Sequence, residues 1–229
     1  MADLQIPAHE RYAEAVASVR KRVPVPKAVW NTMQTEEREH AFTVAEVART
    51  HVLQQVLDAI AKAVEDGTAI TDFRDEVADK LIDQWGGEIP GRIEAIFRTN
   101  IGYAYAEGRY AINSAPAVKE ARPYWRYDDT DNDRECDECH DCHGTVLPAD
   151  DPWWDDHHPP LHHQCECTVT ALSPEEAADE GVDEEGPDAE ADDGFGEEPS
   201  VEGKDWEPDL SGLDPELRAA LEERLAEMR

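Results

Sequence analysis

Basic side chains are scarce in the second half of this sequence. Residues 128–172 contain 13 acidic residues against one basic residue, Arg134, and residues 173–212 contain 17 against Lys204. The first 127 residues are almost balanced, so most of the net charge of −33 lies after them. Phosphate backbones repel a chain of this charge. The composition therefore argues against sequence-independent binding of DNA by the whole chain.

Long apolar runs are also missing. No stretch of the sequence approaches the ~20 consecutive apolar residues that a membrane-spanning helix requires. Residues 1–7 lack the charged and then apolar layout of a signal peptide. We therefore expect no membrane partner, and a protein that is first used in the cytoplasm.

Cysteine is absent from most of the chain, and all five cysteines lie between residues 136 and 167. In a cytoplasmic protein, an odd number of cysteines clustered in this way indicates metal binding before it indicates disulfides. This cluster is the most informative chemical feature of the sequence.

The first half of the sequence has the apolar periodicity of helices, and we interpret residues 1–115 as a helical domain. Thr43 and Glu46 have the Thr-x-x-Glu spacing of a capping box, which predicts the start of a long helix that ends at Gly67. Two more helices are expected after it. The predicted packing faces of the three helices are Leu53, Leu57, Ile60 and Val64; Phe73, Val77, Leu81 and Trp85; and Ile93, Phe97, Ile101 and Tyr105.

Short β-rich segments follow Pro116 and are separated by turns that contain proline. Residues 124–127, 145–147 and 168–170 are the expected strands. A module of this kind, over residues 116–172, has little core of its own, so a bound metal would supply the missing stability. The expected fold class is α+β, with a helical N-terminal region followed by a small zinc-stapled module that contains β-strands.

The acidic residues 173–212 have almost no aliphatic side chains, so they bury too little apolar surface to offset the entropy of ordering. We expect a disordered linker there. Residues 213–229 return to helical spacing, with Asp214 as N-cap and Pro215 at the first position. This terminal helix is expected either to dock as a peptide into the groove of a partner or to fold back onto the main body.

Five residues are candidate ligands for a structural zinc ion: Cys136, Cys139, His162, Cys165 and Cys167. The two-residue gap of Cys136-x-x-Cys139 lets two thiolates bind one ion, and the second segment completes a closed Cys₄ or Cys₃His site. Alternate residues of a regular strand point in opposite directions. Cys165 and Cys167 therefore share an ion only if the backbone turns there, and otherwise His162 replaces one of them. A catalytic zinc, a disulfide and inert thiols are the alternatives.

Further histidines leave a second function open. His140, His143 and Cys142 are candidates for supporting residues or for ligands of a second ion. Asp156-His157-His158, beside two cysteine pairs, resembles an HNH-type nuclease, in which a zinc-held hairpin supports a catalytic histidine. The second pair here is Cys-x-Cys rather than Cys-x-x-Cys, and no Asn and His at helical spacing follow it. A zinc-supported nuclease acting on DNA is therefore the alternative function.

Several stretches between residues 25 and 172 form a more specific pattern: Asp133-Arg134-x-Cys136-x-x-Cys139 with Gly144, Asp151-Pro152-Trp153-Trp154, Pro159-Pro160-Leu161-His162 with Cys165-x-Cys167, and Arg98-Thr99-Asn100. Taken together, they resemble the Mu F-like head morphogenesis proteins, which are minor capsid components of tailed bacteriophages. Glu166 departs from the family at a position where arginine is usual, His143 stands in the place of an aspartate, and Cys142 and His163 look like additions.

The resemblance implies a non-enzymatic protein that enters the procapsid in few copies near the portal vertex. Its implied partners are the portal protein and a scaffold or major capsid protein. Its implied location is the host cytoplasm during assembly and then the capsid interior of the virion. Contact with packaged DNA agrees with the family, although the charge of the chain does not indicate it.

Overall fold

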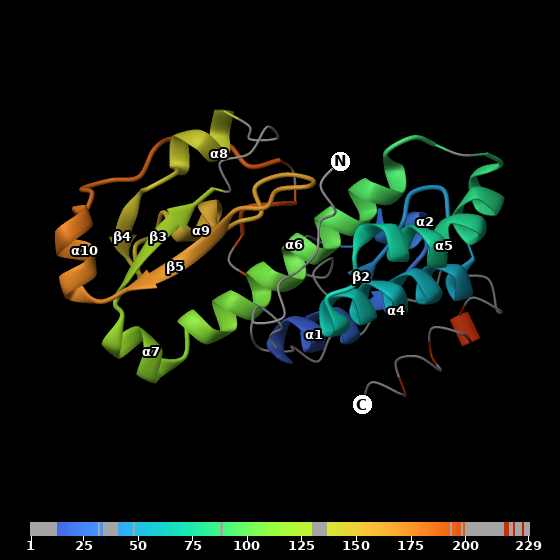
Figure 1. Ribbon diagram of the computed structural model, residues 1–229, viewed down its shortest axis with the longest axis horizontal. Helices are drawn as coiled ribbons and strands as arrows, with labels where there is room; N and C mark the ends of the chain where they lie inside the picture. Colours follow the sequence, from blue (N-terminus) through green and yellow to red (C-terminus); the bar gives the residue numbers. More distant parts are fainter. Residues whose placement is uncertain are drawn as a thin grey trace. The chain divides into compact units, whose positions relative to one another are not determined.

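The computed structural model describes residues 13–31, 33, 41–47, 49–87, 89–129, 137–192, 194–197 and 199, with positions 218, 219, 222 and 226 near the C-terminus (Figure 1). The chain divides into two compact units, one ending at Phe97 and the other running from Arg98 to Val201. Helices dominate the first unit and a three-stranded sheet lies in the second. The expected α+β class is therefore confirmed.

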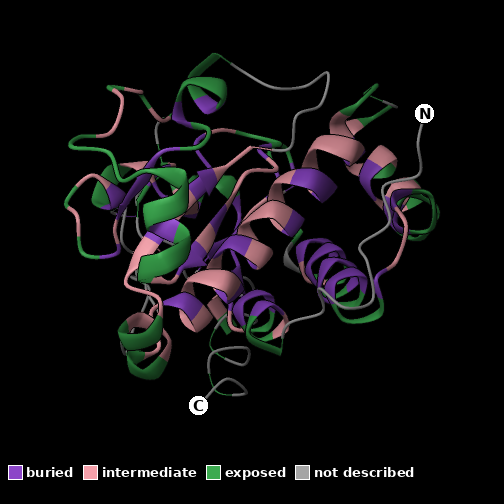
Figure 2. Cartoon of the chain, turned by 60° about the vertical axis from the view of Figure 1, so that its left-hand side comes forward, coloured by how far each residue is buried: buried purple, intermediate pink, exposed green. Residues whose placement is uncertain are grey.

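The first unit is built around two long helices that pack against each other, α4 and α5. Each helix buries one stripe of side chains, which Figure 2 shows as purple bands along the ribbons. Leu53 and Ile60 of α4 and Phe73 and Leu81 of α5 are almost fully buried, so these stripes are packing faces as predicted. The elements are α1 (Ala13–Arg20), β1 (Val23–Pro24), α2 (Lys27–Trp30), β2 (Ala41–Phe42), α4 (Thr50–Asp66) and α5 (Ile70–Trp85).

The prediction for the start of α4 was wrong. The helix begins at Thr50, with Arg49 at the N-cap and no side-chain capping bond. Glu46, the expected capping-box acid, has a left-handed backbone with φ of 63°. A residue in that conformation does not belong to the first turn of a right-handed helix. The predicted end is confirmed, because Gly67 adopts the left-handed conformation of a helix C-cap.

The boundary between the two units lies inside α6 (Arg92–Asn113). Phe97 belongs to the first unit, where its ring centroid lies 5.0 Å from that of Phe73. From Arg98 onwards the helix belongs to the second unit, and α7 (Pro116–Ala121) follows it. The sequence suggested a domain boundary after residue 115, whereas the compact units divide within the helix.

The second unit contains an antiparallel sheet with the strand order β4-β3-β5. Its strands are β3 (Tyr124–Asp128), β4 (Val146–Pro148) and β5 (Thr168–Leu172), and each overlaps one of the expected segments. Along β3 burial alternates, and Trp125 and Tyr127 point into the core. One face of the central strand thus supplies large aromatic side chains to the interior.

The core of the second unit combines aromatic rings with cysteine side chains. Trp154, at the start of α9 (Trp154–His157), meets the ring of Trp125 edge-on with centroids 5.6 Å apart. Cys139 and Cys142 belong to the same buried cluster and come from the short helix α8 (Asp137–Cys142). The cysteines are therefore part of the packing of this small module as well as candidate ligands.

After β5, the structure describes regular contacts in a segment where the sequence predicts a disordered linker. The helix α10 (Pro174–Glu180) begins at a capping box formed by Ser173 and Glu176. Residues 181–192 and 194–197, here called the strap, then run along the second unit. The backbone N–H of Asp183 donates to the carbonyl of Val146 at 2.9 Å, which extends the edge of the sheet at β4. Backbone hydrogen bonds of this kind do not depend on aliphatic side chains, so composition gives no sign of them.

The predicted helix over residues 213–229 lies almost wholly outside the described residues. The four positions described there, Arg218, Ala219, Glu222 and Ala226, are helical. Among the helices of the described part of the chain, none is long and apolar enough to cross a membrane.

Candidate metal centre

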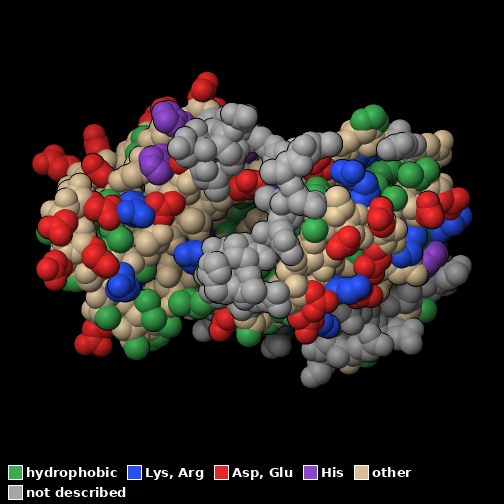
Figure 3. Space-filling model, viewed as in Figure 1, with side chains coloured by type: hydrophobic (Ala, Val, Ile, Leu, Met, Phe, Trp, Pro, Cys, Tyr) green, Lys and Arg blue, Asp and Glu red, His purple; other side chains and the backbone are tan. Residues whose placement is uncertain are grey.

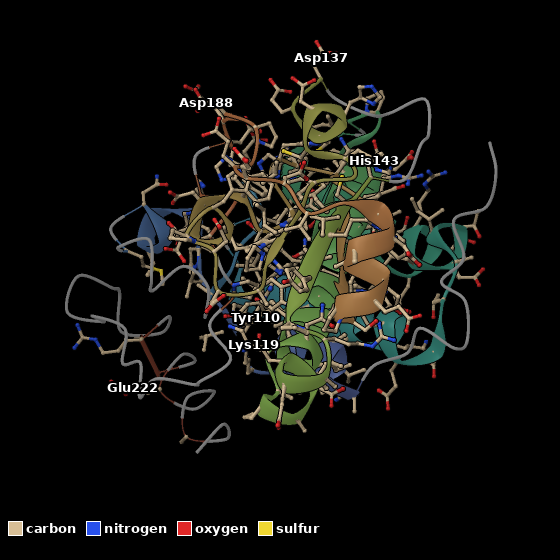
Figure 4. The ribbon with its side chains drawn as sticks, turned by 90° about the vertical axis from the view of Figure 1, so that its left-hand side faces the viewer. Tyr110, Lys119, Asp137, His143, Asp188 and Glu222 are labelled. Carbon is tan, nitrogen blue, oxygen red and sulfur yellow. The ribbon has the colours of Figure 1, made fainter. Side chains whose placement is uncertain are left out.

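Cys139 enters the candidate site from α8. The residue is 1% exposed, and the hydroxyl of Tyr127 on β3 donates a hydrogen bond to its sulfur over 3.7 Å. Asp137 begins the helix, where a negative charge is favourable, and Figure 4 shows it at the outer end, pointing away from the module. Cys136, the predicted partner in the Cys-x-x-Cys motif, lies outside the described residues.

The other candidates come from the loop between α9 and β5. The N–H of Cys165 donates to the carbonyl oxygen of His162 at 3.3 Å and so closes a turn. Gln164, inside this turn, has a left-handed φ of 64°. The turn lies just before Cys165 and directs this residue back towards His162. Residues 165–167 come before β5 (Thr168–Leu172), so they are not part of a regular strand whose alternation would separate Cys165 from Cys167.

Three potential ligand atoms converge on one point. The sulfur of Cys139 lies 3.2 Å from Nε2 of His162 and 3.8 Å from the sulfur of Cys165, and all three atoms lie within 4.8 Å of one another. Tetrahedral zinc with ordinary bond lengths separates two sulfurs by roughly 3.8 Å and a sulfur from a nitrogen by roughly 3.6 Å. The sulfur–sulfur separation matches an edge of such a tetrahedron, and the sulfur–nitrogen separation is about 0.4 Å shorter than its edge. Two thiols and an imidazole at this spacing are the donor set of a zinc site, so these residues fit a zinc ion.

Cys167 lies beside these three residues. Its thiol is half-buried and interacts electrostatically with the thiols of Cys139 and Cys165. It is not part of the group whose ligand atoms lie within 4.8 Å of one another. Cys167 is thus a candidate for the fourth ligand from the described part of the chain, and Cys136 is the other candidate on sequence grounds.

The electrostatics of the cluster favour one thiolate. Hydrogen bonds from Cys139 and Cys167 hold the pKa of the Cys165 thiol well below its usual value. Hydrogen bonds to Cys165 and Cys167, followed by burial, raise the pKa of Cys139. Burial also raises the pKa of Tyr127, so its hydroxyl stays protonated and remains a donor. Because thiolates bind metal, Cys165 is ready to act as a ligand and Cys139 would release a proton on binding.

A family model supplies the identification. The model, described as phage Mu protein F like protein, matches residues 54–170, which is just over half of the chain. The chain belongs to this family. The matched stretch includes Cys139, His162, Cys165 and Cys167, so the candidate metal centre of this Mu F-like chain lies inside the region that defines the family.

Two curated relatives carry the same resemblance. The chain is 31% identical over 163 residues to the putative capsid assembly protein F of Escherichia phage Mu, and 32% identical over 159 residues to the Mu-like prophage FluMu F protein of Haemophilus influenzae. Each match covers 63% of this chain, but 36% and 38% of the respective relatives. The match thus spans less than two fifths of their length. No solved structure gives a significant match.

The histidines that motivated the nuclease alternative are built into the fold of this Mu F-like chain. His158 is 2% exposed, and its Nδ1–H donates to the carbonyl of Pro159 at 3.0 Å. The ring nitrogens of His157 lie 2.8 Å and 2.9 Å from the carbonyl oxygens of Trp153 and Ala189. Backbone contacts thus engage both nitrogens of His157, while His158 is buried, so both histidines contribute to the packing of the second unit.

The remaining candidates lie outside the converging group. The carboxylate of Asp129 is buried and lies 2.9 Å from Nδ1 of His143 and 3.8 Å from Nδ1 of His140. His163 packs its ring against Phe195 in the strap. Cys142 is fully buried in the core. Within the described residues, the group of ligand atoms within 4.8 Å consists of the three named above.

Two residues next to the candidate centre were not expected there from the sequence. Tyr127 donates to Cys139, and Arg98 pairs with Glu166 between the two cysteines of the Cys-x-Cys motif. Both contacts join residues that are distant in sequence or on different elements. The alternating pattern of β3 marks Tyr127 as a core residue, but no sequence signal connects it to a thiol.

Proposed function

We propose that this chain is a head-assembly protein of a tailed bacteriophage, incorporated into the procapsid near the portal vertex as a minor, non-enzymatic component. The observation that carries the proposal is the family match together with the name of the phage Mu relative, putative capsid assembly protein F. The match runs from residue 54 in α4 to residue 170 in β5 and includes the sheet and the cysteine cluster, to which we assign the assembly role.

We further propose that the cluster is a structural zinc site. Cys139, His162 and Cys165 supply three ligands, and Cys167 or Cys136 supplies the fourth. Four protein ligands in a buried site leave no open position for a substrate, which is the arrangement of structural rather than catalytic zinc. A bound ion would tie α8 to the loop before β5 and so add stability to a module with a small core.

The partners proposed are the portal protein and a scaffold or major capsid protein. Figure 3 shows acidic side chains, in red, over much of the second-unit face in view. Such a surface repels nucleic acid and favours partners that offer basic segments. The proposed location is the host cytoplasm during assembly and the interior of the capsid afterwards.

Elemental analysis of the purified full chain tests the zinc site. We expect about one zinc per chain, and a loss of the near-UV circular dichroism of the buried tryptophans when a chelator removes the metal. Cys139→Ala should abolish zinc binding, whereas Cys142→Ala, in the same short helix and equally buried, should retain it. Zinc-free wild-type protein with an unchanged melting curve in chelator would reject the site.

Assembly in the presence and absence of the chain tests the head role. The chain is co-expressed with the portal, scaffold and major capsid proteins of the phage that encodes it, and the purified particles are probed for the chain. We expect the chain in particles that contain the portal and little of it in particles assembled without the portal. Equal amounts in both would reject the portal-proximal location, and absence from all particles would reject the assembly role.

A plasmid-cleavage assay with Mg²⁺ or Mn²⁺ separates assembly from nuclease function. We expect no cleavage above that of the His157→Ala and His158→Ala variants. Cleavage by the wild-type chain that both substitutions remove would overturn the non-enzymatic assignment.

A further inference from the structure

One face of α6 lies against the loop that carries the second half of the proposed zinc site. Arg98 and Gly102 are four residues apart, so they lie on the same side of the helix, and Thr99 lies next to Arg98. Each of the three contacts a different residue of the segment Gln164–Glu166. In Figure 1, this loop lies beside the green helix α6.

Arg98 forms an ion pair with Glu166, the residue between the two cysteines of the Cys-x-Cys motif. The side chain of Arg98 is 3% exposed and that of Glu166 is 23% exposed. An unpaired carboxylate on the residue between two thiolate ligands would raise the cost of gathering negative charge around the ion. The guanidinium offsets that charge and fixes the position of the loop at the same time.

Gly102 allows the loop to approach the helix closely. A Cβ atom at this position would lie 2.7 Å from the carbonyl oxygen of Cys165, a distance that real Cβ contacts essentially never show. The obstacle is a backbone atom of the residue that carries a proposed ligand, so it cannot be relieved by rotating a side chain. The absence of a side chain at residue 102 therefore sets how close Cys165 lies to α6.

Thr99 supports the turn itself. Its Oγ1 accepts a hydrogen bond from the N–H of Gln164 at 3.0 Å. Gln164 is the residue with the left-handed φ of 64°, a conformation that costs energy for a residue other than glycine. The hydroxyl thus stabilises the strained turn that brings Cys165 into line with His162.

We propose that Arg98, Thr99 and Gly102 are positioning residues that hold the Cys165 loop in the geometry required for metal binding and thereby set the affinity of the site for zinc. The inference rests on the proposed zinc site and goes further, because it assigns the affinity to a helix face that supplies no ligand. Holding ligands in place before the metal arrives removes part of the entropy cost of binding. Residues that orient metal ligands typically contribute 10–100-fold to metal affinity.

Gly102→Ala separates positioning from general stability. Alanine is the better helix former, so the substitution favours α6 itself while pushing away the carbonyl of Cys165. We expect zinc affinity, measured by competition with a chromogenic chelator, to fall at least about tenfold. The ligand-field absorption of the Co²⁺-substituted protein should also change. The matched control is Gly87→Ala, since a Cβ there meets nothing within 4 Å, and it should leave both readouts unchanged.

A charge exchange tests the ion pair independently. Glu166→Arg places two guanidinium groups together and should weaken zinc binding at least about tenfold. The double variant Arg98→Glu with Glu166→Arg restores an opposite pair and should recover most of the lost affinity. This rescue distinguishes positioning through the pair from a general effect of substitution in the loop.

The outcomes distinguish the two proposals. If wild-type protein binds zinc and Gly102→Ala binds it with equal affinity and an unchanged Co²⁺ spectrum, the positioning role is overturned and the zinc site stands. If wild-type protein binds no zinc, the zinc site is rejected and the positioning role falls with it. Should Gly102→Ala fail to fold, the charge exchange tests the positioning role instead. A double variant that binds zinc as weakly as Glu166→Arg would then overturn that role.

Discussion

We expect His158 to make the stability of the second unit depend on pH. The residue is 2% exposed, its Nδ1–H donates to the carbonyl of Pro159, and its ring meets that of Tyr110 edge-on with centroids 5.2 Å apart. Burial lowers the pKa of His158 from 6.5 to about 4, because the imidazolium form loses its hydration in this core. Acidification from pH 7.5 to pH 4 is therefore the perturbation that tests the structural role of this histidine.

The sign and size of the effect follow from the two pKa values. Between pH 6.5 and pH 4 the unfolded chain binds a proton at His158 that the folded chain does not, so the unfolding free energy falls as the pH falls. The contribution of His158 is fully present above pH 6.5 and is lost as the pH approaches 4. At about 1.4 kcal/mol per pH unit, the loss amounts to about 3 kcal/mol.

Urea unfolding followed by tryptophan fluorescence measures this loss. His158→Asn cannot titrate, and its amide nitrogen can replace the Nδ1–H donor. Any release of zinc at low pH is common to wild type and His158→Asn. The difference between their profiles of unfolding free energy against pH therefore measures the contribution of His158. We expect the variant to be less stable than wild type at pH 7.5 and to lose about 3 kcal/mol less between pH 6.5 and 4.

The control is His51→Gln, on the exposed face of α4, which should leave the pH profile of wild type unchanged. Parallel profiles for wild type and His158→Asn would refute the reasoning. They would mean that His158 is hydrated and titrates near its ordinary pKa, which would reopen a chemical role for the His157-His158 pair.

Three further substitutions test the packing. Ser173→Ala removes the capping box with Glu176 and should destabilise α10 by about 1 kcal/mol, seen as about fivefold faster amide exchange in that helix. Gly186→Ala places a Cβ 2.5 Å from the indole of Trp153 and should displace the strap. The displacement should make cleavage of the strap by a glutamate-specific protease faster, and an unchanged cleavage rate would contradict the contact. Leu53→Ala, in the core of the first unit, should cost about 2–5 kcal/mol of unfolding free energy in urea, and a smaller loss would mean that the site collapses around the alanine.

Much of the fold was predictable because side-chain periodicity reports burial. The faces of α4, α5 and α6 and the three strands of the second unit follow directly from apolar spacing. The start of α4 was not predictable, because the Thr43-x-x-Glu46 spacing is a local pattern that the tertiary fold overrides. The left-handed backbone of Glu46 depends on the turn after β2, which no spacing rule describes.

The candidate site was predictable at the level of residue types but not of geometry. Cysteine and histidine spacing pointed to Cys139, His162, Cys165 and Cys167, and the structure brings the first three together. The alignment of Cys165 with His162 depended on the left-handed turn at Gln164, a residue that carries no glycine-like signal in the sequence. The contacts of the loop with α6 also escaped prediction, because they join positions more than sixty residues apart.

The strap shows why composition misjudged the acidic segment. The disorder rule weighs apolar side chains against chain entropy, whereas the strap is held largely through its backbone. The N–H groups of Asp192 and Gly196 donate to the carbonyl oxygens of Leu161 and Pro160 at 2.8 Å and 3.1 Å. These carbonyls come directly before His162, so the strap rests on the loop that carries the proposed zinc ligands. An ion that fixes this loop would also fix the two carbonyl oxygens that accept hydrogen bonds from the strap. A segment with few apolar side chains can therefore be ordered, because the loop against which it lies is rigid.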